Sequence, residues 1–235
     1  MVNGTVITLY LMRSGPSCAD ALDGCTANIA KAAAAFGAQR DGINDALAGT
    51  PYNAVDIKPG CRLTLDDGQS VRLRDAYSDP GLTTYGRDRS RAAGRELRRR
   101  VEPDLVVVSP LTRALATCLH LRFAAAPIVC YPGIKEIGSK LPENARRPVA
   151  ALRRDRDLCC LPRFEDIDFS LVAEGEDATL QGFAAWLQGR PERDIWVVAH
   201  HNSIQWLLKD AGGHIPNCVP IPTEMASDGT FRPVG

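Results

Sequence analysis

The chain has 235 residues, of which 45% are hydrophobic and 24% are charged. This is the composition of a globular protein with enough apolar side chains for a sizeable core, and it excludes disordered, collagen-like and other fibrous classes. Basic and acidic residues both number 28, so the formal net charge is zero. Because no overall field draws such a chain toward nucleic acid or an anionic membrane, we expect neither as a partner.

The longest apolar run near the N-terminus covers residues 6–12, far short of the ~20 residues that a membrane span needs. It is not preceded by the basic stretch of a signal peptide. These observations predict a cytoplasmic protein and leave its oligomeric state open.

Eight cysteines could indicate a disulfide framework, but such frameworks belong to small secreted domains that lack a core. The sequence has no C-x-x-C spacing, which argues against a zinc ribbon or a thioredoxin-type site. We therefore expect most thiols to lie in or near the core, and we single out the vicinal pair Cys159 and Cys160 for oxidation.

Three nearly continuous apolar runs, at residues 6–12, 105–109 and 195–199, predict strands that are buried on both faces of a parallel sheet. Segments with helical periodicity alternate with them, at residues 84–100, 111–123, 178–188 and 203–211. No linker or internal repeat divides the chain. The pattern predicts an α/β fold, a single domain over residues 1–235 with three α/β/α layers and a mostly parallel central sheet.

The segment between the first strand and the next strong helix has a different pattern. An Ala-rich helical piece at 27–36 is followed by segments 61–65 and 71–73, which flank the turn sequence Asp-Asp-Gly-Gln at 66–69 and predict a hairpin. We interpret residues 24–75 as an insertion near the mouth of the active crevice, where loops commonly determine substrate choice.

The residues just after the three main strands are candidates for chemistry, because ligands bind at the carboxyl ends of strands in such sheets. Arg13, Arg113 and His200 fall there. Two guanidinium forks in one crevice suit a phosphate group. In a chain with 23 arginines and 5 lysines, however, any single arginine is more often a surface group, and His200 is equally compatible with a buried structural imidazole.

Other charged or metal-ligating residues are assigned no such role. The helix at 87–100 carries seven arginines in fourteen residues, but no aromatic residue interleaves them, which favours a solvated face over a nucleic-acid patch. His120 and His214 lack partners at metal-ligand spacing, so no metal site is expected.

Five motifs in order give the chain a specific resemblance to a known family. They are Leu9-Tyr-Leu-Met-Arg-Ser-Gly15, Asp79-Pro-Gly-Leu-Thr with Gly86, Ser109-Pro-Leu-x-Arg113, Glu136, and Val197-Val-Ala-His200. Together they resemble the histidine phosphatase superfamily, the phosphoglycerate-mutase-like proteins. The segment 167–172, Arg146, Arg147 and Asn217-Cys218 resemble in particular the plant and fungal members. The resemblance spans about residues 6–218.

The resemblance implies a cofactor-independent phosphomonoesterase that acts on a phosphorylated small molecule or another phosphoester. In that family a histidine in the first motif attacks phosphorus and forms a phosphohistidine. Here Ser14 stands in its place. Carried over, Arg13, Arg113 and His200 would surround the phosphate and Glu136 would protonate the leaving oxygen. Arg146, Arg147 and His201 are candidates for further substrate contacts.

Serine cannot simply replace the histidine, because its hydroxyl needs a base and its side chain is several ångströms shorter. We therefore expect this chain to be inactive or very weak, either because the histidine was replaced by design or because the protein has diverged naturally. The alternative function is a non-catalytic protein that binds phosphorylated ligands. Mutase activity is disfavoured because residues 16–20 lack the Glu-Ser-x-Trp-Asn run. A serine hydrolase is disfavoured because Ser14 lacks a Gly-x-Ser-x-Gly turn.

Overall fold

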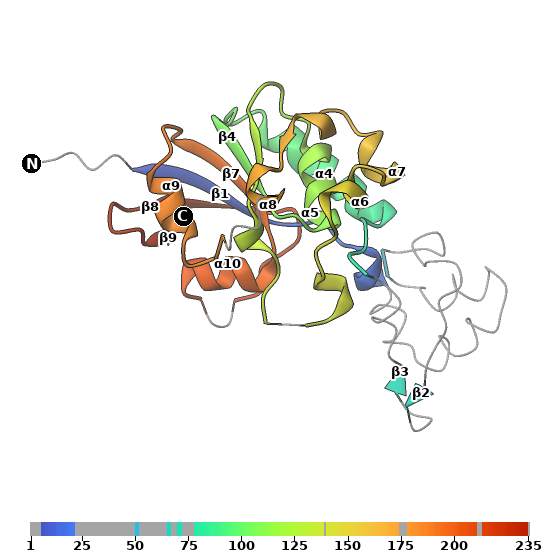
Figure 1. Ribbon diagram of the computed structural model, residues 1–235. Coiled ribbons are helices and arrows are strands. Elements are labelled where there is room, and N and C mark those ends of the chain that lie inside the picture. Colours follow the sequence, from blue (N-terminus) through green and yellow to red (C-terminus); the bar gives the residue numbers. More distant parts are fainter. Residues whose placement is uncertain are drawn as a thin grey trace, which may run out of the picture.

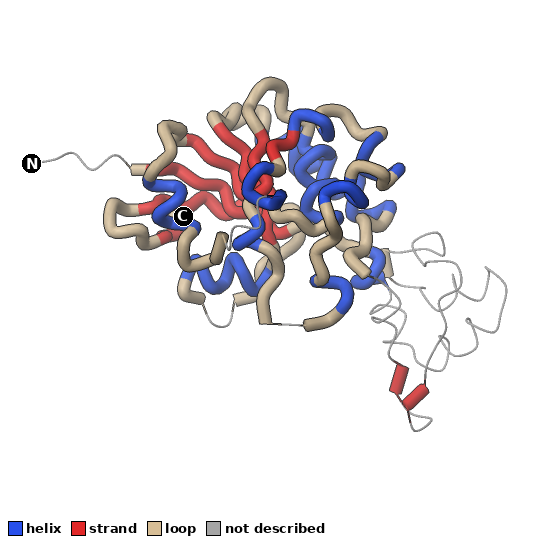
Figure 2. Tube along the Cα trace, viewed as in Figure 1, coloured by secondary structure: helices blue, strands red, loops and turns tan. Residues whose placement is uncertain are grey.

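A computed structural model describes residues 6–21, 50–51, 65–66, 70–71, 78–138, 140–173, 178–210 and 213–234. Its main feature is a seven-stranded sheet with the order β6-β5-β4-β7-β1-β8-β9 (Figures 1 and 2). The strands are β1 (Ile7–Arg13), β4 (Leu105–Val108), β5 (Ile128–Cys130), β6 (Ile167–Asp168), β7 (Asp194–Ala199), β8 (Pro220–Met225) and β9 (Phe231–Pro233).

The three predicted strands form the centre of this sheet. β7 lies between β1 and β4 and is parallel to both, with Val197 in register with Leu11 and with Val107. All four residues of β4 are buried, as expected for a strand that is covered on both faces. The prediction of a mostly parallel sheet is confirmed, and β8 and β9 add an antiparallel edge.

Helices cover both faces of the sheet. The two faces have separate cores, because alternate strand residues point to opposite sides. Val106 and Val108 pack with α4 and α5, whereas Val107 and Val197 pack with α9 and α10. This arrangement confirms the three predicted layers (Figure 1). The α-helices are α4 (Thr84–Leu97), α5 (Thr112–Leu121), α6 (Val149–Leu152), α7 (Arg156–Cys159), α8 (Ser170–Ala173), α9 (Phe183–Gln188) and α10 (His201–Leu208).

Short 3-10 turns connect several of these elements. They are η3 (Pro132–Ile134), η4 (Pro142–Asn144) and η5 (Phe164–Asp166). Within the ranges given above, every helix is too short or too polar to cross a membrane.

The four long helices predicted from periodicity are present, with different ends. The helix predicted at 178–188 begins only at Phe183, because Thr179 Oγ1 accepts the Gly182 N–H at 3.0 Å and the preceding residues form a turn. The helix predicted at 84–100 ends at Leu97 and continues as a turn over residues 98–100.

The predicted hairpin is present as β2 (Leu65–Asp66) paired antiparallel with β3 (Ser70–Val71). Asp66 pairs with Ser70, so the ladder includes Asp66, which we assigned to the turn, and Ser70, which we assigned to neither strand. The rest of the predicted insertion at 24–75 lies outside the described residues, apart from 50–51, and so does the predicted helix at 27–36.

The cysteines of the described residues differ in their burial. Cys118, Cys130 and Cys218 are buried, and Cys18 is half-buried. Burial raises the pKa of the Cys118 thiol to about 12, so this thiol behaves as a small apolar side chain. Cys159 and Cys160 are exposed. The remaining two cysteines fall outside the described residues.

Candidate active site

A polar cavity of about 350 Å³ opens at the carboxyl ends of β1 and β7. Six of its lining residues are sequence-predicted: Arg13, Ser14, Arg113, Glu136, His200 and His201. The remaining lining residues are Ser17, Ala19, Asp20, Leu141, Glu143, Asn144, Asn202, His214 and Asn217.

The end of β1 places Arg13 and Ser14. Arg13 Nη1 donates to the Ile215 carbonyl at 3.0 Å, and Nη2 lies 3.7 Å from Asp20 Oδ1. The main chain of Ser14 is held on both sides, since its N–H donates to the Ala199 carbonyl at 2.9 Å and its carbonyl accepts from Asn217 Nδ2 at 2.6 Å. Ser14 is only 3% exposed.

Close packing fixes the loop that follows. Gly15 N–H donates to Thr117 Oγ1 at 2.9 Å, and Thr83 Oγ1 donates to the Pro16 carbonyl at 2.9 Å. A Cβ on Gly86 would lie 2.2 Å from the Pro16 carbonyl oxygen. The glycine of the second motif therefore lets the first motif rest directly on the start of α4.

Arg113 lies in the first turn of α5 and is almost fully buried. Its Nη1 donates to the Glu143 carbonyl at 2.8 Å and its Nη2 to Asn144 Oδ1 at 2.7 Å. Burial lowers the pKa of the Arg113 guanidinium, and the carboxylates of Asp79 and Asp20 oppose that shift. Because arginine remains protonated in proteins, a fixed positive charge faces the cavity.

His200 is 1% exposed, and its Nε2 lies 2.8 Å from Ser109 Oγ. Burial, followed by the charges of Arg113 and Arg13, holds the pKa of His200 well below its ordinary value of 6.5. The imidazole is therefore neutral at pH 7. The structural and functional interpretations of this residue are not exclusive, because a hydrogen-bonded, buried ring also lines the cavity.

Glu136 is bound to the beginning of α10. Its Oε1 accepts from the backbone N–H groups of Ile137 at 3.1 Å and Asn202 at 3.0 Å. Asn202 belongs to the first turn of α10, where unpaired N–H groups attract a carboxylate. Glu136 thus caps a helix while lining the cavity.

The structure brings His201 to the cavity, where its ring centroid lies 6.0 Å from that of His214. Burial and the charge of Arg13 lower the pKa of His201. The structure does not bring Arg146 or Arg147 to this cavity. Arg146 instead lines a neighbouring cavity with Lys135.

Arg147 belongs to a buried network behind the cavity. Its Nε donates to Asp79 Oδ2 at 3.1 Å, and its Nη2 donates to Asp155 Oδ2 at 2.7 Å and to Thr112 Oγ1 at 2.6 Å. Asp79 in turn accepts from the N–H and the hydroxyl of Thr112, at 2.8 and 2.6 Å. This network fixes the start of α5, directly before Arg113.

The sequence indicates no role for Asp79, although its motif belongs to the family resemblance, and it does not single out Asn144 or Asn202. An asparagine in the Leu-Pro-Glu-Asn segment at 141–144 is typical of a turn. Only the folded chain shows that it contacts Arg113.

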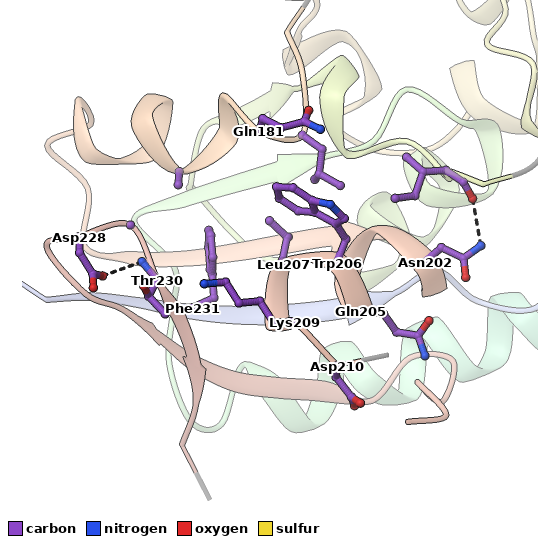
Figure 3. Close-up of a pocket in the computed structure, with 14 residues that line it drawn as sticks. Gln181, Asn202, Gln205, Trp206, Leu207, Lys209, Asp210, Asp228, Thr230 and Phe231 are labelled. Carbon is purple, nitrogen blue, oxygen red and sulfur yellow. Dashed lines mark hydrogen bonds between the residues drawn. The ribbon is translucent and has the colours of Figure 1, made fainter. Parts of the chain in front are cut away.

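A second, larger cavity of about 690 Å³ lies between α9, α10 and the β8–β9 hairpin (Figure 3). Apolar side chains such as Trp206, Leu207 and Phe231 form much of its wall, and Lys209 is its one cation among the described residues. The larger cavity therefore lacks the paired cations that suit phosphate.

The polar cavity has hydrogen-bond donors for an oxyanion. In the part of the chain that the structure describes, no group of three or more His, Cys, Asp or Glu residues could hold a metal ion. Its chemistry is two guanidinium groups, a neutral imidazole, a helix-capping carboxylate and the Ser14 hydroxyl. This set can bind a tetrahedral oxyanion and supply a proton.

Comparisons with known proteins show which fold and family the chain shares. The sequence is not matched by any curated protein. Among solved structures, it is similar to a mycobacterial hydrolase 1, with 17% identity, a TM-score of 0.50, and coverage of 98% of this chain and 97% of that one. At that identity the likeness shows a shared fold.

Two further solved structures are similar to a lesser degree. A mycobacterial glucosyl-3-phosphoglycerate phosphatase with bound VO3 has 19% identity, 97% coverage of both chains and a TM-score of 0.49. A phosphoserine phosphatase from Entamoeba histolytica, in complex with 3-phosphoglyceric acid, has 17% identity, 97% and 93% coverage and a TM-score of 0.45.

A family model gives the identification. It describes the histidine phosphatase superfamily (branch 1) and matches residues 69–219. The match includes Arg113, Glu136 and His200, and it begins after Arg13 and Ser14. Since it covers more than half of the sequence, the chain belongs to the histidine phosphatase superfamily.

Proposed function

We propose that the polar cavity is the active site of a cofactor-independent phosphomonoesterase of the histidine phosphatase type, and that Ser14 leaves this chain with little or no turnover. One observation carries the proposal. Side chains that follow three neighbouring parallel strands, Arg13, Arg113 and His200, line one cavity together with Ser14. The substrate is a phosphorylated small molecule or another phosphoester.

The two arginines bind the phosphoryl group in this proposal. Arg13 and Arg113 each donate to one or two protein oxygens, and a guanidinium has five N–H donors, so each retains donors for phosphate oxygens. The neutral His200 ring lines the same cavity, and its Nε2 lies 2.8 Å from Ser109 Oγ; in this proposal its one N–H turns from Ser109 to a phosphate oxygen when the substrate binds. His201 and His214 contact the remainder of the substrate.

With histidine at position 14, the reaction proceeds in two steps. The imidazole nitrogen attacks phosphorus while the bond to the leaving oxygen breaks, and Glu136 donates a proton to that oxygen. Glu136, now a carboxylate, then takes a proton from a water molecule as the water oxygen attacks phosphorus, and the bond from phosphorus to the histidine nitrogen breaks, which releases phosphate and frees the histidine. This sequence follows the general logic of phosphoryl transfer, in which the protein positions the group and stabilises its charge.

Ser14 interrupts this sequence at the first step. A serine hydroxyl needs a base to become nucleophilic, and its shorter side chain misses the in-line distance that suits imidazole. The cavity would then bind phosphate without releasing it from a substrate. This gives the second candidate function, a non-catalytic protein that binds phosphorylated ligands. The observation that favours this binding function is that Ser14 takes the place of the nucleophile while the other anion-binding side chains are present.

The test compares the chain as it stands with the Ser14→His variant. On p-nitrophenyl phosphate we expect turnover only from the variant, together with an acid-labile phosphoenzyme on rapid quench. Inorganic phosphate should raise the melting temperature of both, because a ligand that binds only the folded state stabilises it. A variant that binds phosphate but forms no phosphoenzyme would favour the binding protein, and an absence of phosphate stabilisation would contradict both.

Arg146 is a candidate for a second anionic group on the substrate, from the neighbouring cavity of about 540 Å³ that it lines with Lys135. In the active background, Arg146→Ala should slow reaction with bis-phosphorylated substrates more than with mono-phosphorylated ones. Equal effects on both would assign Arg146 to the solvated surface.

A further inference from the structure

The side chain of Asn144 lies in the wall of the polar cavity, beside Arg113. Asn144 is the last residue of η4, is 8% exposed and lines the cavity. Its backbone N–H donates to the Leu141 carbonyl at 2.9 Å. The turn therefore brings a nearly buried amide to the wall of the cavity, in contact with Arg113.

The contact with Arg113 determines which way this amide points. Arg113 Nη2 donates to Asn144 Oδ1 at 2.7 Å. Guanidinium groups only donate hydrogen bonds, so the atom that faces Arg113 must be the amide oxygen and the amino group must lie on the other branch. The ambiguity that usually attends an asparagine is removed here by the chemistry of its partner.

The amino group of Asn144 has no acceptor among the described residues, and it is not among their fully covered, unpartnered side-chain atoms. A nearly buried donor without an acceptor is costly unless a ligand or water provides one. Its position points to an oxyanion that also contacts Arg113.

We propose that Asn144 is a phosphoryl-binding residue whose Nδ2 donates to a phosphate oxygen while its Oδ1 holds Arg113 in place. The proposal rests on the proposed function, since it requires phosphate in this cavity. Asn144 adds a neutral donor to two charged ones, and the Asn144–Arg113 pair acts as one planar unit with donors from both residues.

The turn that carries Asn144 is tied to the same network that fixes α5. The Asp79 N–H donates to the Pro142 carbonyl at 3.2 Å, and Asp79 also binds Thr112 and Arg147. Asn144 and Arg113 are thus positioned from one buried anchor, which keeps their relative geometry constant when a ligand enters.

The experiment measures affinity for inorganic phosphate by isothermal titration in the chain as it stands and in Asn144→Ala. A hydrogen bond to a charged group is worth enough that its loss should weaken binding roughly ten- to hundredfold. The control is Gln188→Ala, outside the lining of the polar cavity, because Gln188 Nε2 donates its own side-chain amide hydrogen bond to the Ser227 carbonyl at 2.9 Å. We expect that variant to change phosphate affinity by less than about threefold.

A crystal structure with tungstate, used as a phosphate probe, separates a direct contact from a positioning role. We expect Asn144 Nδ2 within about 3.2 Å of a tungstate oxygen. Phosphate binding that depends on Arg13 and Arg113 but not on Asn144 would overturn this inference alone, as would tungstate bound away from the amide. Failure of the unaltered chain to bind phosphate would overturn both this inference and the proposed function.

Should Asn144→Ala fail to fold, Asn144→Asp serves instead, because it keeps the shape and an oxygen for Arg113 while it removes the donor. It should also weaken phosphate binding at least tenfold, because the donor is lost and the new carboxylate repels the anion. Retained phosphate affinity in Asn144→Asp would contradict the direct contact.

Discussion

Glu136 combines two tasks in one side chain, because one oxygen binds the beginning of α10 while the residue lines the cavity. A carboxylate that only caps the helix would affect all substrates alike. A carboxylic acid that protonates the leaving oxygen would matter most where that oxygen is a poor leaving group. The amide of glutamine keeps an oxygen for the cap and removes the acid, so Glu136→Gln separates the two tasks.

We therefore predict that Glu136→Gln, in the Ser14→His background, lowers kcat on alkyl phosphates by roughly 10²–10⁴-fold, the usual range for general acid catalysis. On p-nitrophenyl phosphate, whose leaving oxygen hardly needs a proton, the loss should be much smaller. Steady-state kinetics on the two substrates measure the difference. An equal loss on both would leave Glu136 as a helix cap.

At the scale of elements, the start of α5 depends on a buried carboxylate. The Asp79 side chain is fully buried, and Arg147 is its cationic partner at 3.1 Å. Burial raises the pKa of Asp79 above its ordinary value, although its bonds to Thr112 and Arg147 oppose the shift. Removal of the arginine would leave a buried charge without its counterion, which is the costly way to break such a pair.

Arg147→Met should therefore lower the free energy of unfolding by roughly 2–4 kcal/mol, a value reduced from that of a fully buried pair because Arg147 is partly exposed. The substitution should also weaken phosphate binding, because Arg147 donates to Thr112 and Thr112 directly precedes the phosphate-binding Arg113. Urea denaturation of Arg147→Met, Asp79→Asn and the double variant measures the coupling. Additive losses would show that the two residues act independently.

The contact between the first loop and α4 gives a second test at this scale. Gly86→Ala would place a Cβ 2.2 Å from the Pro16 carbonyl oxygen, so we predict a loss of about 1–3 kcal/mol or more in the free energy of unfolding. Gly81→Ala is the control, because its Cβ would meet only Thr112 Cγ2 at 3.9 Å. Equal thermal stabilities of the two variants would show that the loop can move away.

At the scale of the whole molecule, several histidines resist protonation. Burial, with the charges of Arg91 and Arg87, lowers the pKa of His120 to about 4, and the pKa values of His200 and His201 are also lowered. Below pH 6.5 the unfolded chain takes up protons at these residues and the folded chain does not. Stability therefore falls as the pH falls below 6.5.

We predict that the free energy of unfolding decreases between pH 6.5 and pH 5, and that His120→Gln removes up to about 2 kcal/mol of that decrease at pH 5. Asp79 acts in the opposite sense, because the pKa of its carboxyl is raised in the folded chain. Parallel urea titrations of parent and variant isolate the histidine. A variant with the same pH dependence as the parent would contradict the buried, neutral His120.

The sequence predicted the centre of the fold well, because buried parallel strands are continuous apolar runs. It did not predict β5 or β6, which have three and two residues, too few for a periodicity. β8 was also missed. It contains Pro220 and Pro222, and proline argues against a strand unless the strand lies near an edge.

In the candidate site, too, the sequence predicts some residues and not others. Strand ends located Arg13, Arg113 and His200, because the carboxyl end of a parallel strand is a position that sequence can give. Arg147 could not be placed in the same way. Its sequence neighbours resemble those of Arg146, and only the ion pairs with Asp155 and with Asp79, which is distant in the sequence, hold its side chain in a partly buried position. Asn144 likewise depends on a contact 31 residues away.

The main-chain bonds at position 14 have a practical consequence. Ala199 and Asn217 hold the backbone of Ser14 without using its side chain, so the residue can be exchanged while its Cα stays in place. Ser14→Cys would put a thiol at the floor of the cavity, where an alkylating reagent that carries a phosphate should react selectively. On the proposed function, the unaltered chain retains a phosphorylated ligand without consuming it, so it would serve as bait for identifying that ligand by mass spectrometry.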